Sequence, residues 1–150
     1  MILDDIFAAS RAGKIELDPF NYSATWNTLA ANATTPVNVA INADSDFVLR
    51  YSMIQSFSAA GTNIALPDYL LTIFDTGSGR QLQDAAQHVL NMCGTAQRPF
   101  IWSEPKLIKS ASTLVLTLTN NTAVAARVDV TLHGFKLFYL RGYSRDTFLG

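Results

Sequence analysis

Residues 113–119 alternate between leucine and β-branched side chains. Leu114, Leu116 and Leu118 occupy every second position, and three threonines and one valine fill the positions between them. Successive side chains of a β-strand point to opposite faces, so this spacing predicts a strand with one face in a core and the other toward solvent. A strand of this kind needs neighbours that cover its leucine face, which restricts the chain to folds built around a sheet.

The same alternation recurs after Pro36. Apolar side chains fill positions 37, 39 and 41 and then, after a turn at residues 42–46, positions 47, 49, 51 and 53. Two alternating runs joined by a turn are typical of paired strands. We therefore expect residues 37–53 to form two adjacent antiparallel strands.

The leucine strand is followed by a second long run. An Asn-Asn-Thr turn at residues 120–122 leads into residues 127–139, in which positions 128, 130 and 132 are apolar. Beyond Gly134 the apolar positions change parity, as a β-bulge in this strand would produce. The pattern predicts that residues 113–139 form a hairpin.

Three shorter segments complete the secondary-structure prediction. Residues 84–94 are the best helix candidate, because Asp84 can cap its start and Gly94 can end it. Prolines flank residues 100–102, which predicts an edge strand or an extended crossing, since proline has no N–H for a central ladder. Residues 77–80, Gly-Ser-Gly-Arg, lack the frame of a phosphate-binding loop and are predicted as a hairpin tip.

These segments together predict an all-β fold. We expect a jelly-roll or β-sandwich of seven to eight antiparallel strands, with extended N- and C-terminal arms. The 150 residues suffice for one domain with an ordinary core. The predicted organisation is an N-terminal arm or first strand at residues 1–36, a β-sandwich at 37–139 and a C-terminal tail at 140–150.

The N-terminal segment carries large aromatic residues without a sustained period. Phe20, Tyr22 and Trp26 are scattered among polar residues, after a short helix-like pattern at positions 2, 6 and 7. Aromatic side chains are unfavourable in water, which suggests an arm that drapes over its own domain or binds a partner. A well-packed first strand is the alternative. An arm predicts that deletion of residues 1–30 leaves the β-domain folded.

The C-terminal segment interleaves aromatic and basic residues. Tyr139, Arg141, Tyr143 and Arg145 alternate, and Phe148 follows them. Arginine and tyrosine are enriched at the energetic centres of protein interfaces, so we expect this tail to dock on a protein partner. Stacking on nucleic acid is the weaker alternative, since a net charge of -1 gives no general attraction to phosphate.

No catalytic or metal-binding constellation is visible in the sequence. His88 and His133 have no ligand at metal-like spacing, and Cys93, the only cysteine, is expected to be a buried apolar side chain. His88 and Cys93 would face different sides of the predicted helix. We expect no enzyme activity and no cofactor. The start of the chain lacks the features of a signal peptide and no stretch approaches a spanning helix, so we expect a soluble, unexported protein.

Residues 47–138, about three-fifths of the chain, resemble a group of small structural proteins of tailed bacteriophages. In these proteins a β-sandwich or jelly-roll domain decorates or cements the capsid shell. The resemblance lies in segments 47–50, 73–80, 98–105, 114–120 and 130–136. Residues 1–36 and 141–150 do not share it.

The resemblance implies a structural virion protein that bridges capsid subunits, located in virions assembled in the host cytoplasm. The expected partner is the major capsid protein or another virion protein, together with further copies of the chain; we expect neither membrane nor nucleic acid. A neck, collar or tail-attachment role is one alternative. A carbohydrate-binding jelly-roll module that stacks ligands on Trp26, Trp102 or Tyr143 is another, and a cupin-like enzyme would need a metal triad.

Overall fold

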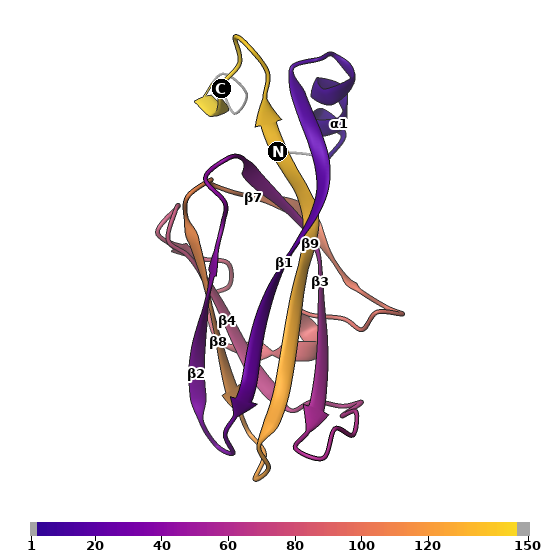
Figure 1. The fold of residues 1–150 in the computed structure, drawn as a ribbon, viewed down its shortest axis with the longest axis vertical. Coiled ribbons are helices and arrows are strands. Elements are labelled where there is room, and N and C mark those ends of the chain that lie inside the picture. The colour runs from indigo at the N-terminus through magenta and orange to yellow at the C-terminus, as the bar shows by residue number, and fades with distance from the viewer. Residues whose placement is uncertain (1–2, 147–150) are drawn as a thin grey trace.

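The computed structural model describes residues 3–146, and these form two antiparallel sheets that face each other (Figure 1). Sheet A has the strand order β1-β9-β3-β7, and sheet B has the order β2-β8-β4-β5, with β6 also paired to β4. The elements are α1 (Leu3–Arg11), β1 (Ile15–Leu29), β2 (Thr34–Ala40), β3 (Asp46–Ser58), β4 (Tyr69–Asp75), β5 (Arg80–Gln81), β6 (Gln87–His88), the 3-10 turn η1 (Val89–Asn91), β7 (Phe100–Ile108), β8 (Thr113–Asn120) and β9 (Ala126–Tyr139).

The predicted all-β sandwich is confirmed. Most successive strands lie in opposite sheets, so that the chain wraps around the core in the manner of a jelly roll. Two of the nine strands in the described part, β5 and β6, are only two residues long. We call Tyr139, Arg141, Tyr143, Arg145 and Phe148 the C-terminal stripe. Phe148 of this stripe and Ile2 of the helix-like pattern lie outside the described residues.

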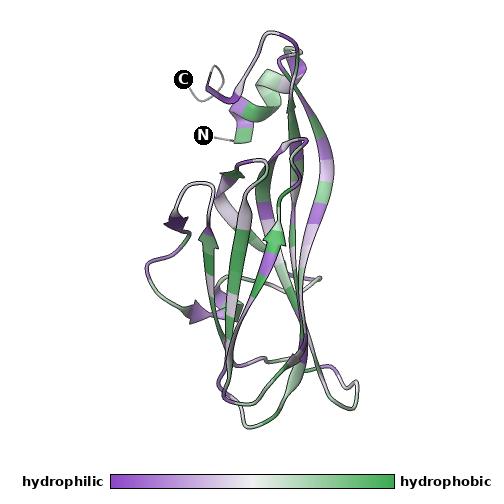
Figure 2. Cartoon of the chain, turned by 60° about the vertical axis from the view of Figure 1, so that its left-hand side comes forward, coloured by the Kyte–Doolittle hydropathy of each residue, from purple (hydrophilic) through white to green (hydrophobic). Residues whose placement is uncertain are grey.

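The alternating leucines of β8 lie at the centre of the main core. Leu114, Leu116 and Leu118 are fully buried between the sheets, whereas the residues between them are partly exposed. Along the strands in Figure 2, hydrophobic positions alternate with hydrophilic ones. The face assignment of this strand from the sequence is therefore confirmed.

Two predicted strand pairings are wrong, because the paired runs belong to different sheets. β8 pairs with β2 and β4, while β9 pairs with β1 and β3, so residues 113–139 do not form a hairpin. Asn120 supports the crossing between the sheets: its side-chain amide donates to the carbonyl groups of Ala30 and Val124, and its Oδ1 accepts from the backbone N–H of Thr122. β2 and β3, predicted as neighbours, also lie in opposite sheets.

The parity of β3 changes at Arg50. Phe47 and Leu49 point into the main core, but the register against both neighbouring strands shifts between Leu49 and Tyr51. Beyond this extra residue, Ser52, Ile54 and Ser56 are buried in place of positions 51 and 53. The bulge therefore lies in β3, and the one predicted in β9 is wrong.

A second core explains the parity change that the sequence shows in β9. Residues 128, 130 and 132 face the main core, whereas Phe135 and Leu137 point to the opposite face of sheet A. There they pack with Val48, Ile15 and the buried Ile6 of α1. β1 and β9 each continue without a break from the main core to this second core. At the end of sheet A beside α1, Ile15 of β1 pairs with Tyr139 of β9. α1 thus covers an extension of sheet A that sheet B does not reach (Figure 1).

The sequence of α1 matches its ends. Asp4 and Asp5 lie in the first turn and Arg11 in the last, where their charges oppose the helix dipole. Gly13 adopts a φ of 69°, and its N–H and that of Lys14 donate to carbonyl groups of the last turn, as in a Schellman motif. This cap turns the chain directly into β1.

The helix predicted at residues 84–94 is absent; β6 and the single turn η1 take its place. Val89, Met92 and Cys93 are all buried in the main core. The backbone N–H of Gly94 donates to Ser52, and its carbonyl accepts from Ile54, so β3 uses the groups that a helix would need. Asp84 and Gly94, which suggested helix caps, therefore lie at the ends of a segment that is hydrogen-bonded to strands of both sheets.

Prolines lie on or beside two of the edge strands of the sandwich, β7 and β2. β7 is the edge strand of sheet A that the flanking prolines predicted. On β2, the bonds of Ala33 and Ile41 to β8 show that odd-numbered positions face β8, so Pro36 faces the free edge of sheet B. The Gly77–Arg80 tip is also confirmed, since Asp75 pairs with Arg80 across a turn.

Candidate interaction surface

The structure places the aromatic residues of the N-terminal segment on β1, which favours the first-strand alternative for residues 1–36 over the arm. Tyr22 and Trp26 are 7% and 3% exposed. The Tyr22 hydroxyl accepts from the N–H of Asn42 at 3.0 Å, and the Trp26 indole donates to the carbonyl of Thr35 at 2.9 Å. Both side chains thus link β1 to the region of β2, and neither is available on the surface of this chain.

Phe20 is half-buried beside an ion pair between the buried Lys136 and the exposed Asp44. Its ring lies edge-on to that of Tyr22, with centroids 4.9 Å apart, and Nζ of Lys136 lies 4.4 Å from its centroid. The same Nζ donates to Oδ2 of Asp44 at 2.8 Å. This hydrogen bond raises the pKa of Lys136 and lowers that of Asp44. Phe20 therefore shields a cation that closes this end of the main core.

Two residues of the C-terminal stripe converge on one buried carboxylate. The hydroxyl of Tyr139 donates to Oδ2 of Asp46 at 2.8 Å, and Nε of Arg145 lies 3.8 Å from the same oxygen. Oδ1 accepts from the backbone N–H of Ser110 at 2.8 Å. Burial and then the hydrogen bond to Asp46 raise the pKa of Tyr139. These contacts fix the chain that follows β9.

The other two residues of the stripe are exposed. Tyr143 is 41% exposed, with Nζ of Lys14 5.9 Å from its ring centroid, and Arg141 is exposed beside it. The backbone N–H of Leu140, itself 37% exposed, donates to the carbonyl of Lys14. We call Lys14, Leu140, Arg141 and Tyr143 the tip patch. It combines two cations with apolar and aromatic surface at the end of the sheet A extension.

The histidines and the cysteine do not come together. His88 lies on sheet B, 3.5 Å from Asp68, whereas His133 lies on sheet A, with Nε2 buried and unpaired among the described residues. Cys93 is buried in the main core, as predicted, and burial raises its pKa to about 12. Within residues 3–146, no three His, Cys, Asp or Glu side chains group as metal ligands would.

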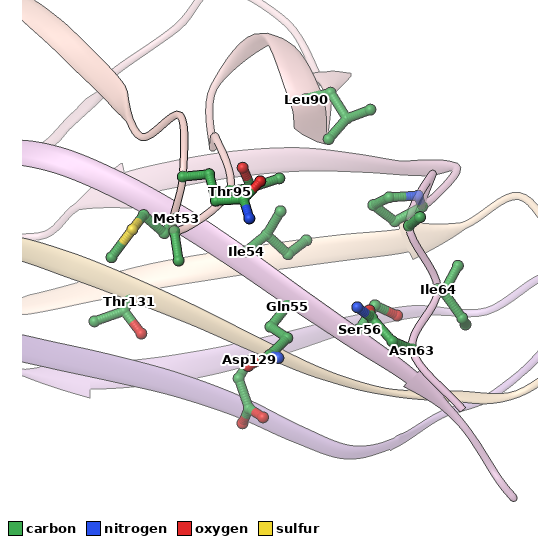
Figure 3. Close-up of a pocket in the computed structure, with 14 residues that line it drawn as sticks. Met53, Ile54, Gln55, Ser56, Asn63, Ile64, Leu90, Thr95, Asp129 and Thr131 are labelled. Carbon is green, nitrogen blue, oxygen red and sulfur yellow. The ribbon is translucent and has the colours of Figure 1, made fainter. Parts of the chain in front are cut away.

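A cavity of about 460 Å³ lies beside the outer edge of β3 (Figure 3). Residues 53–56 of β3 line it, together with residues 63–65, Pro67, Leu90 and residues 95–97. Asp129 and Thr131 of β9 complete the lining. No sequence pattern indicates this cavity, because its lining comes from several segments whose proximity depends on the topology.

No helix in residues 3–146 has the length and apolarity that crossing a membrane would require. Neither a protein-family model nor a curated protein matches the chain. Among solved structures, it is similar to a chain of the cyanophage Pam1 capsid asymmetric unit, with 18% identity and a TM-score of 0.42 over 81% of this chain and 86% of that one. It is also similar to a chain of the acidic stable capsid of Helicobacter pylori bacteriophage KHP30, with 10% identity and a TM-score of 0.41 over 84% and 99%.

Proposed function

We propose that this chain is a structural protein of a bacteriophage virion that decorates or cements the capsid by bridging its subunits. This is the class that the sequence resemblance implies, and it places the protein in the virion. The proposal includes association with further copies of the chain. It assigns no chemical step to the protein, whose role would be to bind and to hold neighbouring subunits together.

The observation that carries the proposal is the tip patch at the end of the sheet A extension. The extension has its own small core beneath α1, and Asp46 anchors the segment that displays Arg141 and Tyr143. A rigid display lowers the entropy lost on binding, and exposed Arg and Tyr are the residue types that contribute most at protein interfaces. These features suit a protein that reaches from its own domain to a neighbouring subunit.

The fold does not choose between functions, since jelly rolls also occur in lectins and cupins. For a carbohydrate-binding module, Trp26 is excluded as a stacking platform by its burial. Trp102 is half-buried, stacks edge-on against Phe100 and donates to Oγ of Ser52 at 3.2 Å. Of the three proposed platforms, only Tyr143 offers an exposed ring. Neck, collar or tail attachment would use the same tip patch.

Co-sedimentation with capsid shells assembled from a bacteriophage major capsid protein tests the proposal. We expect the protein to pellet with shells, and the double variant Arg141→Ala/Tyr143→Ala to bind at least about tenfold more weakly, as loss of interface anchors does. Arg80→Ala, which removes an exposed arginine from β5, is the matched control and should bind normally. Absence of wild-type protein from the pellet would refute the proposal.

A further inference from the structure

The outer edge of β3 is covered in pieces beyond the point where β7 leaves it. Gly94 forms a single parallel bridge there, donating to the carbonyl of Ser52 and accepting from the N–H of Ile54. Further along, the N–H of Ile64 donates to the carbonyl of Ser56, and the N–H of Ser58 donates to Thr62. Even-numbered residues of this part of β3 therefore direct their backbone groups toward the edge.

One step of this edge, made of the carbonyl of Ile54 and the N–H of Ser56, is not paired by the segments that cover the rest. The same alternation directs the carbonyl of Ile54 and the N–H of Ser56 outward, and neither group has a hydrogen-bond partner within residues 3–146. The chain turns away on both sides, since Thr95 and Arg98 pair with each other and Ala65 leads to Pro67. Ile54 and Ser56 both line the 460 Å³ cavity.

We propose that this step receives an extended segment from a neighbouring capsid-shell subunit, an inference that rests on the proposed function. An acceptor and a donor on successive edge positions of a strand match the N–H and C=O of one extended residue. Polar edge groups that are removed from water at an interface need such partners. Ile64, Pro67 and Leu90 provide apolar lining for the side chain that enters the cavity.

The geometry limits the partner. Because Gly94 and Ile64 already cover the positions on either side, only one residue can pair with β3 before the segment must leave the edge. A long strand would collide with both covering segments. The occupant is therefore a loop or a chain end with one extended residue, and the apolar lining from Ile64, Pro67 and Leu90 favours an apolar side chain at that position.

A matched pair of variants tests this inference. Ser56→Pro removes the edge N–H, and proline is tolerated at an edge position whose N–H has no partner. Ser56→Ala keeps the N–H and loses the same hydroxyl contact with Tyr69. In the shell co-sedimentation assay, we expect Ser56→Pro to bind roughly ten- to a hundredfold more weakly than Ser56→Ala, because a bound carbonyl loses its donor.

Amide exchange of the wild-type protein provides a second measurement, which holds even if Ser56→Pro does not fold. The N–H of Ser56 should exchange faster than those of Ile54 and Ser58 in the free protein and become protected on shells. Equal affinities of the two variants, or a Ser56 amide whose exchange shells leave unchanged, would overturn the inference while the proposed function stands. Failure of wild-type protein to bind shells would overturn both.

Discussion

The hydroxyl of Tyr139 donates a 2.8 Å hydrogen bond to the carboxylate of Asp46, a residue that is 4% exposed. The two residues are 93 positions apart in the chain, and their bond ties the end of β9 to the start of β3. It lies between the main core and the tip patch. The orientation of the tip patch therefore depends on a buried polar contact as well as on apolar packing.

Tyr139→Phe should destabilise the protein by about 1–3 kcal/mol, because the buried carboxylate loses a donor. Urea unfolding followed by fluorescence measures the effect. Tyr143→Phe is the control, since this exposed tyrosine should change the free energy of unfolding by less than about 0.5 kcal/mol. Equal unfolding midpoints for the two variants would show that Asp46 does not depend on the Tyr139 hydroxyl.

Leu116→Ala should cost roughly 2–5 kcal/mol of stability, since the side chain is fully buried between the sheets. Thr117→Ala on the opposite face of β8 should cost much less. Urea melts of both variants test the register of the strand. If Thr117→Ala were the more destabilising change, the two faces of β8 would be exchanged.

Truncations distinguish the roles of α1 and β1. Deletion of residues 1–12 removes α1 and exposes the small core around Val48, so we expect a folded protein with a lower unfolding midpoint. Deletion of residues 1–30 also removes Tyr22, Trp26 and Leu29 from the main core and should abolish cooperative unfolding. A cooperative thermal transition in the longer truncation would restore the arm interpretation of residues 1–36.

The sequence predicted which face of a strand is buried better than it predicted which strands pair with each other. Alternation shows which side of β8 is buried, because that depends only on the strand itself, but it carries no information about which strand lies beside it. In a jelly roll, successive strands cross between sheets, so the hairpins inferred from short turns were wrong. Side-chain caps and local spacing likewise misassigned residues 84–94, whose backbone is bonded to β3 and β4.

Only part of the candidate site was predicted, because the strands that carry it contact two cores. β1 and β9 each serve two cores on opposite faces, and their buried positions change parity between Leu17 and Phe20 and between Leu132 and Phe135. This change hid the periodicity that would have identified Tyr22 and Trp26 as core residues. Arg141 and Tyr143 are exposed, as partner-binding residues must be, while their role stays a prediction.

Cys93 should make stability fall at high pH. Burial raises the pKa of its thiol from 9.0 to about 12, so the stabilisation is complete below pH 9 and is lost as the pH rises toward 12. The loss should reach about 3 kcal/mol near pH 11. Urea midpoints across pH 8–11 test this, with Cys93→Ala expected to show a shallower decline. Parallel declines for the two proteins would exclude the thiol as a source.

Gly134→Ala should be strongly destabilising, by about 1–3 kcal/mol or more. A Cβ at this position would lie 1.8 Å from the carbonyl oxygen of Val48, opposite the bulge in β3. Gly61→Ala is a useful comparison, because there the space is open and only the φ of 80° opposes a side chain. Its cost should be roughly 1–2 kcal/mol. Thermal unfolding that ranks Gly61→Ala as the worse variant would contradict the predicted crowding at the bulge.

Pro36 bears on the behaviour of many copies held close together. An edge strand with a complete row of N–H groups can template the addition of a like strand, and the chance of this rises with local concentration. With a proline at the free edge of sheet B, that row is interrupted at its middle. At this edge, crowded copies of the protein can therefore meet through their side chains without pairing one β2 strand with another.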